Sequence, residues 1–493
     1  MNLLTLLSLA AVTSVGVADT SVSTSAKSIN ATCNAIAAAV SSASGLYYNG
    51  MIGFAGSTYD LDMYHWASSS TQQAVCAFEP GTAQDVAIAL QIIGKNKCPF
   101  AVKGGGHATN PGFSSTIGVQ IAMYRFSEVT YNSAAQTVTI GAGLIWDGVY
   151  AALEPYGVNV VGGRVTGVGV AGLTLGGGYS WLTNQHGLTI DTVTAYELVL
   201  PSGSVVNVTQ SSNPSLFFAL KGIVTRFTLQ AFPQGQVWGG SIYYNSSLVD
   251  QVTAATAAFS ANCTDPKAQI ITTYNYISGE ASLIHLIVSE LLFYDAPTAP
   301  SGIFDQFLAI PALQSDISTR SFLSLVQSSG SNQTAGLRGI FNTVSVTGYP
   351  LELLNAIVNE TTYWGETLGL PSGTFISYDV EPFLPTIFTH NTSSSAYPGS
   401  RKFGVFPLNL YFAWTDSSAD QQMQAATRTS ASALYNKAIA LGQSIQDAPL
   451  YNNYAIFSTP LQSIYGDNVD VLHSIKKKVD PANVMGLAGG FKF

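Results

Sequence analysis

Short apolar runs on either side of one helical repeat predict a strand-helix-strand unit near the start of the chain. Residues 75–78 and 100–102 are apolar runs of strand length, and Val86, Leu90 and Ile93 recur between them on one face of a helix. A glycine-rich loop follows the second run directly. Because ligands collect outside the carboxyl ends of strands in open α/β sheets, this loop is the first candidate for a binding site.

The pattern further along the chain predicts an α+β fold with a second domain. A strand at 137–140 leads to a helix near 145–156, and residues 196–200 form a hairpin with 205–208 across a Pro-Ser-Gly turn. From about residue 234 the apolar runs become longer and glycines become fewer. The chain shows no internal repeat and no low-complexity linker.

Composition excludes several classes of function. The chain has 493 residues, more than the roughly 250–300 at which one hydrophobic core stops growing, so more than one domain is expected. Its net charge is −9 with only 19 Lys plus Arg, which argues against a nucleic-acid partner. The one basic run, 476–478, is expected to complement the end of a final helix. No Cys-x-x-Cys pair or histidine-rich spacing predicts a metal site.

The beginning of the chain has the features of a secretory leader. Residues 3–12 are apolar over the length of a signal-peptide core and too short to span a bilayer, and small residues precede Asp19. We therefore expect cleavage after residue 18, secretion without a membrane anchor, and a glycoprotein. Seven Asn-x-Ser/Thr sequons agree with this route: Asn30, Asn207, Asn245, Asn262, Asn332, Asn359 and Asn391.

The loop after residue 102 combines glycines with a nucleophile in the order Lys103, Gly104, Gly105, Gly106, His107. Successive glycines can turn their N–H groups toward an anion such as a pyrophosphate, and the imidazole is then placed to react with the group that the pyrophosphate carries. This combination predicts a tethered dinucleotide cofactor. The loop lacks both the Walker motif and the Gly-x-Gly-x-x-Gly opening of a Rossmann helix.

A second glycine-rich segment at 162–179 and four later motifs carry a family resemblance. The chain resembles the FAD-linked oxidases of the vanillyl-alcohol oxidase superfamily, in the berberine-bridge-enzyme-like branch with its fungal members. The resemblance covers nearly the whole mature chain, through the Gly-Gly-His loop and the segments 168–178, 187–193, 451–455, 480–481 and 489–491.

The resemblance implies a two-part PCMH-type FAD-binding domain and an antiparallel-sheet substrate domain backed by helices. The expected boundaries are a leader at 1–18, the FAD-binding domain at 19–233, the substrate domain at 234–445, and a C-terminal segment at 446–493 that returns to the FAD-binding domain.

The resemblance also implies a covalent flavin. His107 is expected to bond the 8α-carbon of FAD, although a histidine after glycines can instead cap a turn. Many relatives have a second tether through a cysteine, but this chain has Val165 there, so a single histidyl bond is expected. The expected cofactor contacts are Lys103, Gly104, Gly105, Gly106, His107, Gly169, Gly172, Gly177, Val224 and Asn453, with close backbone packing as the alternative role of the later glycines.

Tyr451 is the leading catalytic candidate, because similar enzymes place a tyrosine from this segment on the substrate side of the flavin. A buried tyrosine bonded to a backbone carbonyl is the alternative. Asp379 and Glu381 alternate on one face of a predicted strand and are candidate bases, although exposure to solvent explains them equally well. Asn409 lies near a position where some relatives carry a carboxylate or glutamine, and it shares a strand face with Tyr411.

Two further expectations concern the first domain. By resemblance, a disulfide joins Cys33 to Cys98, which leaves Cys76 and Cys263 unpaired. The turn Leu220-Lys221-Gly222-Ile223 is about six residues shorter than its counterpart in relatives. Either the enzyme tolerates a shorter turn, or the deduced sequence has lost a short coding piece, or flavin binding is impaired.

These expectations describe a secreted, monomeric FAD-dependent oxidase. It would transfer hydride from a small-molecule alcohol, phenol or secondary metabolite to the flavin, with oxygen as the acceptor. A carbohydrate or oligosaccharide oxidase is one alternative. A flavin-free binding protein that keeps only the fold is the alternative of another class.

Overall fold

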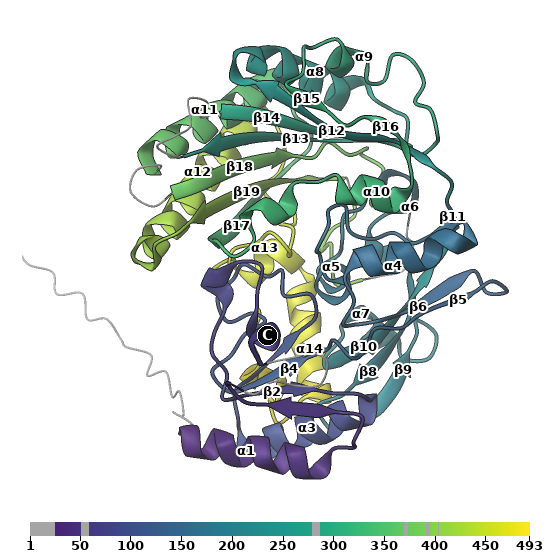
Figure 1. Ribbon diagram of the computed structural model, residues 1–493, viewed down its shortest axis with the longest axis vertical. Coiled ribbons are helices and arrows are strands. Elements are labelled where there is room, and N and C mark those ends of the chain that lie inside the picture. Colours follow the sequence, from purple (N-terminus) through teal and green to yellow (C-terminus); the bar gives the residue numbers. More distant parts are fainter. Residues whose placement is uncertain (1–24, 51–58, 279–285, 369–372, 391–394, 403) are drawn as a thin grey trace, which may run out of the picture.

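The computed structural model describes residues 25–50, 59–278, 286–368, 373–390, 395–402 and 404–493, and these build an α+β fold, as predicted (Figure 1). The expected leader at 1–18 and the sequon at Asn391 lie outside the described residues. Of the other six sequon asparagines, Asn245 is half-buried and the rest are exposed.

The first sheet has the strand order β1-β2-β4-β3 and contains the predicted strand-helix-strand unit. Thr82 caps α3 by accepting a hydrogen bond from the Asp85 amide. Strand β4 lies between β2 and β3 and is parallel to both, so the glycine loop leaves from an edge strand. The elements are α1 (Ala26–Ala39), β1 (Gly45–Tyr47), α2 (Tyr59–Met63), β2 (Cys76–Glu79), α3 (Ala83–Asn96), β3 (Phe100–Lys103) and β4 (Val119–Ala122).

The second sheet is antiparallel, with the order β5-β6-β10-β8-β9. The predicted hairpin is confirmed, because β8 pairs with β9 across the turn at 200–204. The second glycine segment lies between β7 and α6 and includes α5. The elements are β5 (Val129–Asn132), β6 (Thr137–Gly141), α4 (Trp146–Leu153), β7 (Val158–Asn159), α5 (Val170–Leu175), α6 (Thr183–His186), β8 (Val193–Val199), β9 (Val205–Val208), α7 (Pro214–Phe218), β10 (Ile223–Gln230) and β11 (Phe232–Pro233).

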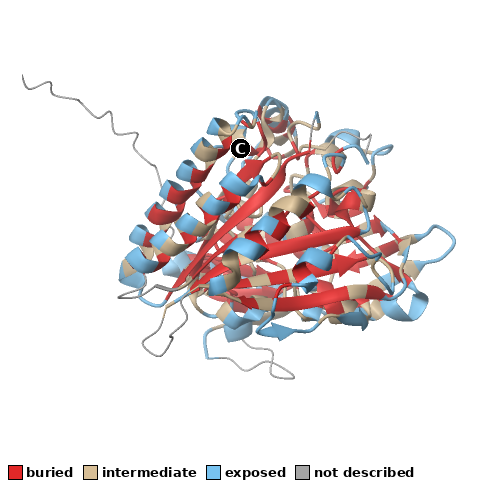
Figure 2. Ribbon diagram, turned by 90° about the horizontal axis from the view of Figure 1, so that it is seen from above, coloured by how far each residue is buried: buried red, intermediate tan, exposed pale blue. Residues whose placement is uncertain are grey.

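The third sheet is the antiparallel one expected for the substrate domain, with the order β15-β12-β14-β13-β18-β19-β17 and β16 (Ser318–Arg320) on β12. Helix α11 packs on β13 and β18, and α12 packs on β17 and β19. Figure 2 shows the strands buried and the outer faces of these helices exposed. The elements are β12 (Val237–Asn245), α8 (Val249–Asn262), β13 (Ala268–Ile277), β14 (Leu286–Tyr294), α9 (Asp305–Leu308), β15 (Gln314–Ser315), α10 (Phe322–Gln327), β17 (Arg338–Val346), α11 (Leu351–Leu368), β18 (Gly373–Val380), β19 (Phe406–Trp414) and α12 (Asp420–Ala440).

The last segment of the chain lies beside the first two sheets (Figure 1). It contains α13 (Leu461–Tyr465) and α14 (Asn468–Val479), whose last turn holds the three lysines at 476–478. Ala488 then forms a parallel bridge with Phe100 at the start of β3. The chain therefore ends against the strand that carries the glycine loop.

The predicted disulfide between Cys33 and Cys98 is wrong. Cys33 is bonded to Cys76, with a Cα–Cα distance of 6.3 Å, and Cys98 is a buried free thiol. The reason is the direction of side chains on α1. Thr32 faces Cys98, whereas Cys33, one residue further along the helix, faces the start of β2. Cys263, expected to be unpaired, is free.

Candidate active site

The two glycine segments touch each other directly. A Cβ atom on Gly105 would lie 2.5 Å from Gly169 Cα, and one on Gly169 would lie 2.6 Å from Gly105 N. Glycine is therefore required on both sides of this contact. Gly106 has a φ of +72°, which side-chain-bearing residues rarely adopt. The sequence keeps these positions free of side chains so that the loops can meet at the carboxyl end of β3.

A cavity of about 1070 Å³ lies between the glycine loops and the third sheet. This volume exceeds the usual range for one small ligand, so it can hold a cofactor and a substrate together. Twelve of the predicted site residues line it: Gly104, Gly105, Gly106, His107, Gly169, Gly172, Val224, Asp379, Glu381, Asn409, Tyr451 and Asn453.

Two predicted contacts do not line the cavity. The Lys103 ammonium donates to the Leu61 carbonyl at 2.9 Å and to the Tyr124 hydroxyl at 2.5 Å, beneath the loop. Gly177 packs on the ring of Tyr397, which a Cβ atom would approach to 2.6 Å. In the structure both residues contact other parts of the protein and not the cavity.

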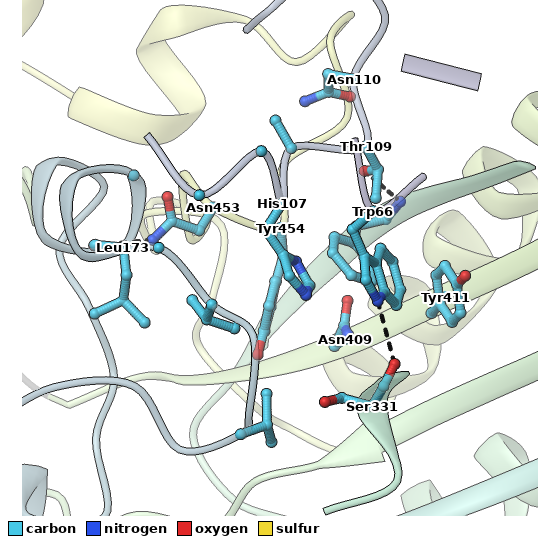
Figure 3. Close-up of a pocket in the computed structure, with 18 of the residues that line it drawn as sticks. Trp66, His107, Thr109, Asn110, Leu173, Ser331, Asn409, Tyr411, Asn453 and Tyr454 are labelled. Carbon is cyan, nitrogen blue, oxygen red and sulfur yellow. Dashed lines mark hydrogen bonds between the residues drawn. The ribbon is translucent and has the colours of Figure 1, made fainter. Parts of the chain in front are cut away.

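His107 presents a free nitrogen to the site. Its Nε2 atom is buried without a hydrogen-bond partner among the described residues, and the imidazole lies beside the indole of Trp66 (Figure 3). Burial lowers the pKa of His107 to about 4. The imidazole is therefore neutral near pH 7, which is the form that can act as a nucleophile.

The cavity walls fit a dinucleotide. No hydrogen bond among the described residues engages the amides of Gly105, Gly106 or His107, so these donors are available to an anion. A Cβ atom on Gly172 would meet nothing within 4 Å, so this glycine opens onto empty cavity space. FAD would be held by the amides of the first loop, by the backbone around Gly169 and Gly172, and by His107.

Tyr451 is buried, and its hydroxyl oxygen accepts two hydrogen bonds. The donors are the Asn453 side-chain amide at 2.9 Å and the Tyr179 backbone amide at 3.4 Å. Burial raises the pKa of Tyr451, and these donors together with the nearby Arg164 cation oppose the increase. Because hydrogen bonds donated to the oxygen stabilise the phenolate, these contacts favour proton exchange between Tyr451 and a ligand in the cavity.

Asp379 and Asn409 form a pair across neighbouring strands. They are directly opposite in the register of β18 and β19, and the Asn409 side-chain amide donates to Asp379 Oδ2 at 2.8 Å. Burial raises the pKa of Asp379. Asn409 Oδ1 is buried without a partner among the described residues, so it can accept a hydrogen bond from a substrate. Both side chains line the cavity, and Asp379 is half-buried rather than exposed.

Glu381 belongs to a buried cluster with two residues that the sequence analysis did not single out. Its carboxylate lies 2.7 Å from the Arg164 guanidinium and accepts a hydrogen bond from the Tyr454 hydroxyl at 3.0 Å. Burial raises the pKa of Glu381 to about 7, although Arg164 opposes the increase. An arginine inside an apolar glycine-rich segment was a usable signal for this site, because the chain has few cations. No comparable signal pointed to Trp66.

The short turn lies at the cavity despite its length. Leu220, Gly222, Ile223 and Val224 contribute to the cavity wall. The Lys221 ammonium lies 3.5 Å from the centre of the Phe493 ring, so the end of the chain packs against this turn. Gly222 and its neighbours therefore line the cavity in which the flavin is expected.

Within the described residues, no cluster of three or more His, Cys, Asp or Glu side chains could hold a metal ion. In the same part of the chain, no helix has the length and apolarity needed to cross a membrane.

Comparisons with known proteins agree with this geometry. Residues 74–209 match the FAD binding domain family. An uncharacterized FAD-linked oxidoreductase of Arthroderma benhamiae is 31% identical over 74% of this chain and 75% of its own length. A FAD-dependent monooxygenase, tpcD, of Cochliobolus heterostrophus is 30% identical over 87% of this chain and 86% of its own.

Solved structures share the fold. Wild-type Physcomitrella patens BBE-like 1 superposes with a TM-score of 0.72 at 19% identity, covering 92% of this chain and 97% of that one. Chitooligosaccharide oxidase gives 0.71 at 18% identity, covering 94% of this chain and all of that one.

The fold and the cavity define a flavin-dependent oxidoreductase. This chain belongs to the family of fungal FAD-linked oxidoreductases with the PCMH-type, berberine-bridge-enzyme-like fold.

Proposed function

We propose that the protein is a secreted oxidase that holds FAD through a single bond to His107 and removes hydride from a small-molecule alcohol, phenol or secondary metabolite. The observation that carries the proposal is the neutral His107 imidazole, whose Nε2 is unpartnered among the described residues at the mouth of the glycine loop. FAD, when bound, would accept the hydride, and molecular oxygen would reoxidise the reduced flavin.

The side chains of the cavity support a division of roles. Tyr451, as the phenolate that its two donors stabilise, accepts the hydroxyl or amine proton of the substrate as the substrate C–H bond breaks, and becomes the neutral phenol. Asn409 accepts a hydrogen bond from the substrate through Oδ1, and Asp379 orients the Asn409 side chain. Val165 stands where a second, cysteinyl tether would require a thiolate, so a single bond is expected.

Acid precipitation tests the proposal. Protein purified after expression with FAD is precipitated in trichloroacetic acid, and flavin absorbance is measured in the pellet and the supernatant. Colour in the pellet supports a covalent flavin. Colour only in the supernatant contradicts the tether, and a colourless protein favours a flavin-free binding function. Labelled oxygen then separates the reactions, because an oxidase releases the label as peroxide and a monooxygenase incorporates it into product.

A carbohydrate oxidase is the second candidate. It is supported by the hydroxyl and amide side chains on the cavity face of the third sheet and by the fold of chitooligosaccharide oxidase. Peroxide release from oligosaccharides, with none from phenols or alcohols, would favour it over our first proposal.

Secretion as a monomer is the last part of the proposal. It is supported by the apolar leader and by the exposed sequon asparagines in the described residues. Expression of the full chain in a fungal host tests it. Protein in the medium that begins at Asp19 and runs as one copy on a sizing column is expected, and retention inside the cell contradicts secretion.

A further inference from the structure

The cavity face of the third sheet carries a straight row of polar side chains across five strands. Tyr243 on β12 is opposite Ser289 on β14, which is opposite Thr273 on β13. Thr273 is opposite Asp379 on β18, and Asp379 is opposite Asn409 on β19. We call these five residues the polar row, and all five line the cavity.

The polar row faces open space, whereas the other face of the same strands is closed by helices. Ser289 and Thr273 are half-buried, and Val288 and Tyr274, next to them in the chain, are fully buried. Because successive side chains of a strand point to opposite faces, this alternation separates a packed face from a face that only the cavity covers.

The two ends of the polar row differ in chemistry. At one end, Thr273 and Asn409 both hydrogen-bond Asp379. At the other end, Ser289 accepts a hydrogen bond from the Asn275 amide at 3.0 Å, and no hydrogen bond among the described residues engages the Tyr243 hydroxyl. The far end therefore offers neutral donors and acceptors that are free to meet a ligand.

The charged side chains beside the polar row lie at the end formed by Asp379 and Asn409. Arg164 is the only Lys or Arg among the described residues that line the cavity, and it is paired with Glu381. Glu290, next to Ser289, also contributes to the cavity wall, but its carboxylate is buried and accepts a hydrogen bond from the Thr272 hydroxyl at 2.7 Å. An anionic substrate would find no free cation among the described residues along the polar row, so a neutral substrate is favoured.

Strand spacing sets the length of this row. Neighbouring strands lie about 4.8 Å apart, so Ser289 is roughly 14 Å and Tyr243 roughly 19 Å from Asn409. One sugar ring or one phenol ring cannot reach from Asn409 to Ser289. Ile271 and Leu291 on one side, and Ile277 and Phe375 on the other, give the row apolar borders on which rings can pack.

We infer that Ser289 and Tyr243 form a distal subsite for an elongated, neutral substrate that carries hydroxyl groups near both ends. One end would react beside Asp379 and Asn409, and the other would hydrogen-bond to Ser289 and Tyr243. The inference rests on the proposed function for the identity of the reacting end. It assigns specificity for substrate length to two residues outside the catalytic set.

Calorimetric titration of the flavin-loaded enzyme tests the subsite with two length series. One series runs from glucose to cellotriose, and the other from hydroquinone to para-terphenyl diol. In at least one series, we expect the long member to bind at least tenfold more tightly than the short one. The series that shows the effect tells whether the substrate is a carbohydrate or an aromatic.

Two variants locate the effect. Ser289→Leu and Tyr243→Phe should each reduce the advantage of the long probe by about threefold or more, and leave the short probe within twofold, since each removes a hydrogen bond that only the long probe makes. Ser315→Val, on exposed β15 of the same sheet, is the control that should change neither.

Equal affinity of short and long probes in both series, or no binding by either, overturns the subsite. An advantage that survives in both variants also overturns it. The outcome is separate from the proposed function. If acid precipitation leaves all flavin in the supernatant but the length advantage and its loss in the variants persist, the subsite stands and the proposed covalent oxidase falls.

Discussion

The imidazole of His107 stacks on the indole of Trp66, with ring centroids 4.4 Å apart and planes 14° from parallel. Trp66 is fixed at both ends, because its backbone amide donates to the Gly106 carbonyl at 3.0 Å and its indole N–H donates to the Ser331 carbonyl at 3.2 Å. The stack covers one face of the imidazole and restricts its orientation.

Replacing His107 by alanine should remove the covalent flavin. We expect His107→Ala to release all of its flavin into the supernatant on acid precipitation, because no other nucleophile is expected at the tether. His473→Ala, on the exposed face of α14, is the matched control and should keep colour in the pellet. Colour that stays fixed to the His107→Ala protein would place the bond elsewhere.

Filling the space beside Gly172 should exclude the cofactor without unfolding the protein. A Cβ atom here meets no protein atom within 4 Å, so Gly172→Leu should project into the cavity and lower the flavin content at least tenfold. Gly235→Leu is the control, because Gly235 is exposed and equally uncrowded. Flavin absorbance per protein and the thermal midpoint are the measurements. Unchanged flavin content in the Gly172 variant contradicts the assigned cradle.

Removing the Tyr451 hydroxyl should slow catalysis and spare the flavin. We expect Tyr451→Phe to lower kcat roughly a hundredfold or more, which is the usual loss for a general base, with normal pellet colour. Tyr363→Phe, an exposed tyrosine, should behave as the unmodified enzyme. Stopped-flow bleaching of the flavin by substrate measures the step directly. A rate within threefold of normal would assign the proton transfer to another group.

Glu381 should make the protein less stable as pH rises from about 4.5 to 7. Its pKa is raised to about 7 in the fold, so the folded protein holds a proton that the unfolded chain has lost in this window. Relative to Glu381→Gln, which does not titrate, the free energy of unfolding should fall by roughly 3 kcal/mol across the window. Urea midpoints of both proteins at pH 4.5 and 7.5 measure this.

A constant difference between the two proteins would show that Glu381 keeps an ordinary pKa. An increase with pH would mean that attraction to Arg164 outweighs the cost of burying the carboxylate. Groups common to both proteins cancel in the comparison.

Much of the site was predictable because its parts lie in local patterns. Gly104 to His107 follow a predicted strand, so local order alone predicts a loop at the carboxyl end of that strand. The alternation of Asp379 with Tyr378 likewise predicted which side chains share a face. The partners on the next strand could not be predicted this way, because the register between two strands depends on packing across the sheet.

The sequence by itself determined the strand-helix-strand unit and the hairpin of the first half, the two glycine-rich loops, and the histidine that follows the first of them. Only the tertiary structure decided that Cys33 reaches Cys76 rather than Cys98, that Arg164 is paired with Glu381, and that Trp66 covers His107. The physical reason is the distance along the chain over which each kind of interaction acts. Backbone preferences and apolar periodicity act between near neighbours, whereas these pairs form only when distant segments are packed into one core.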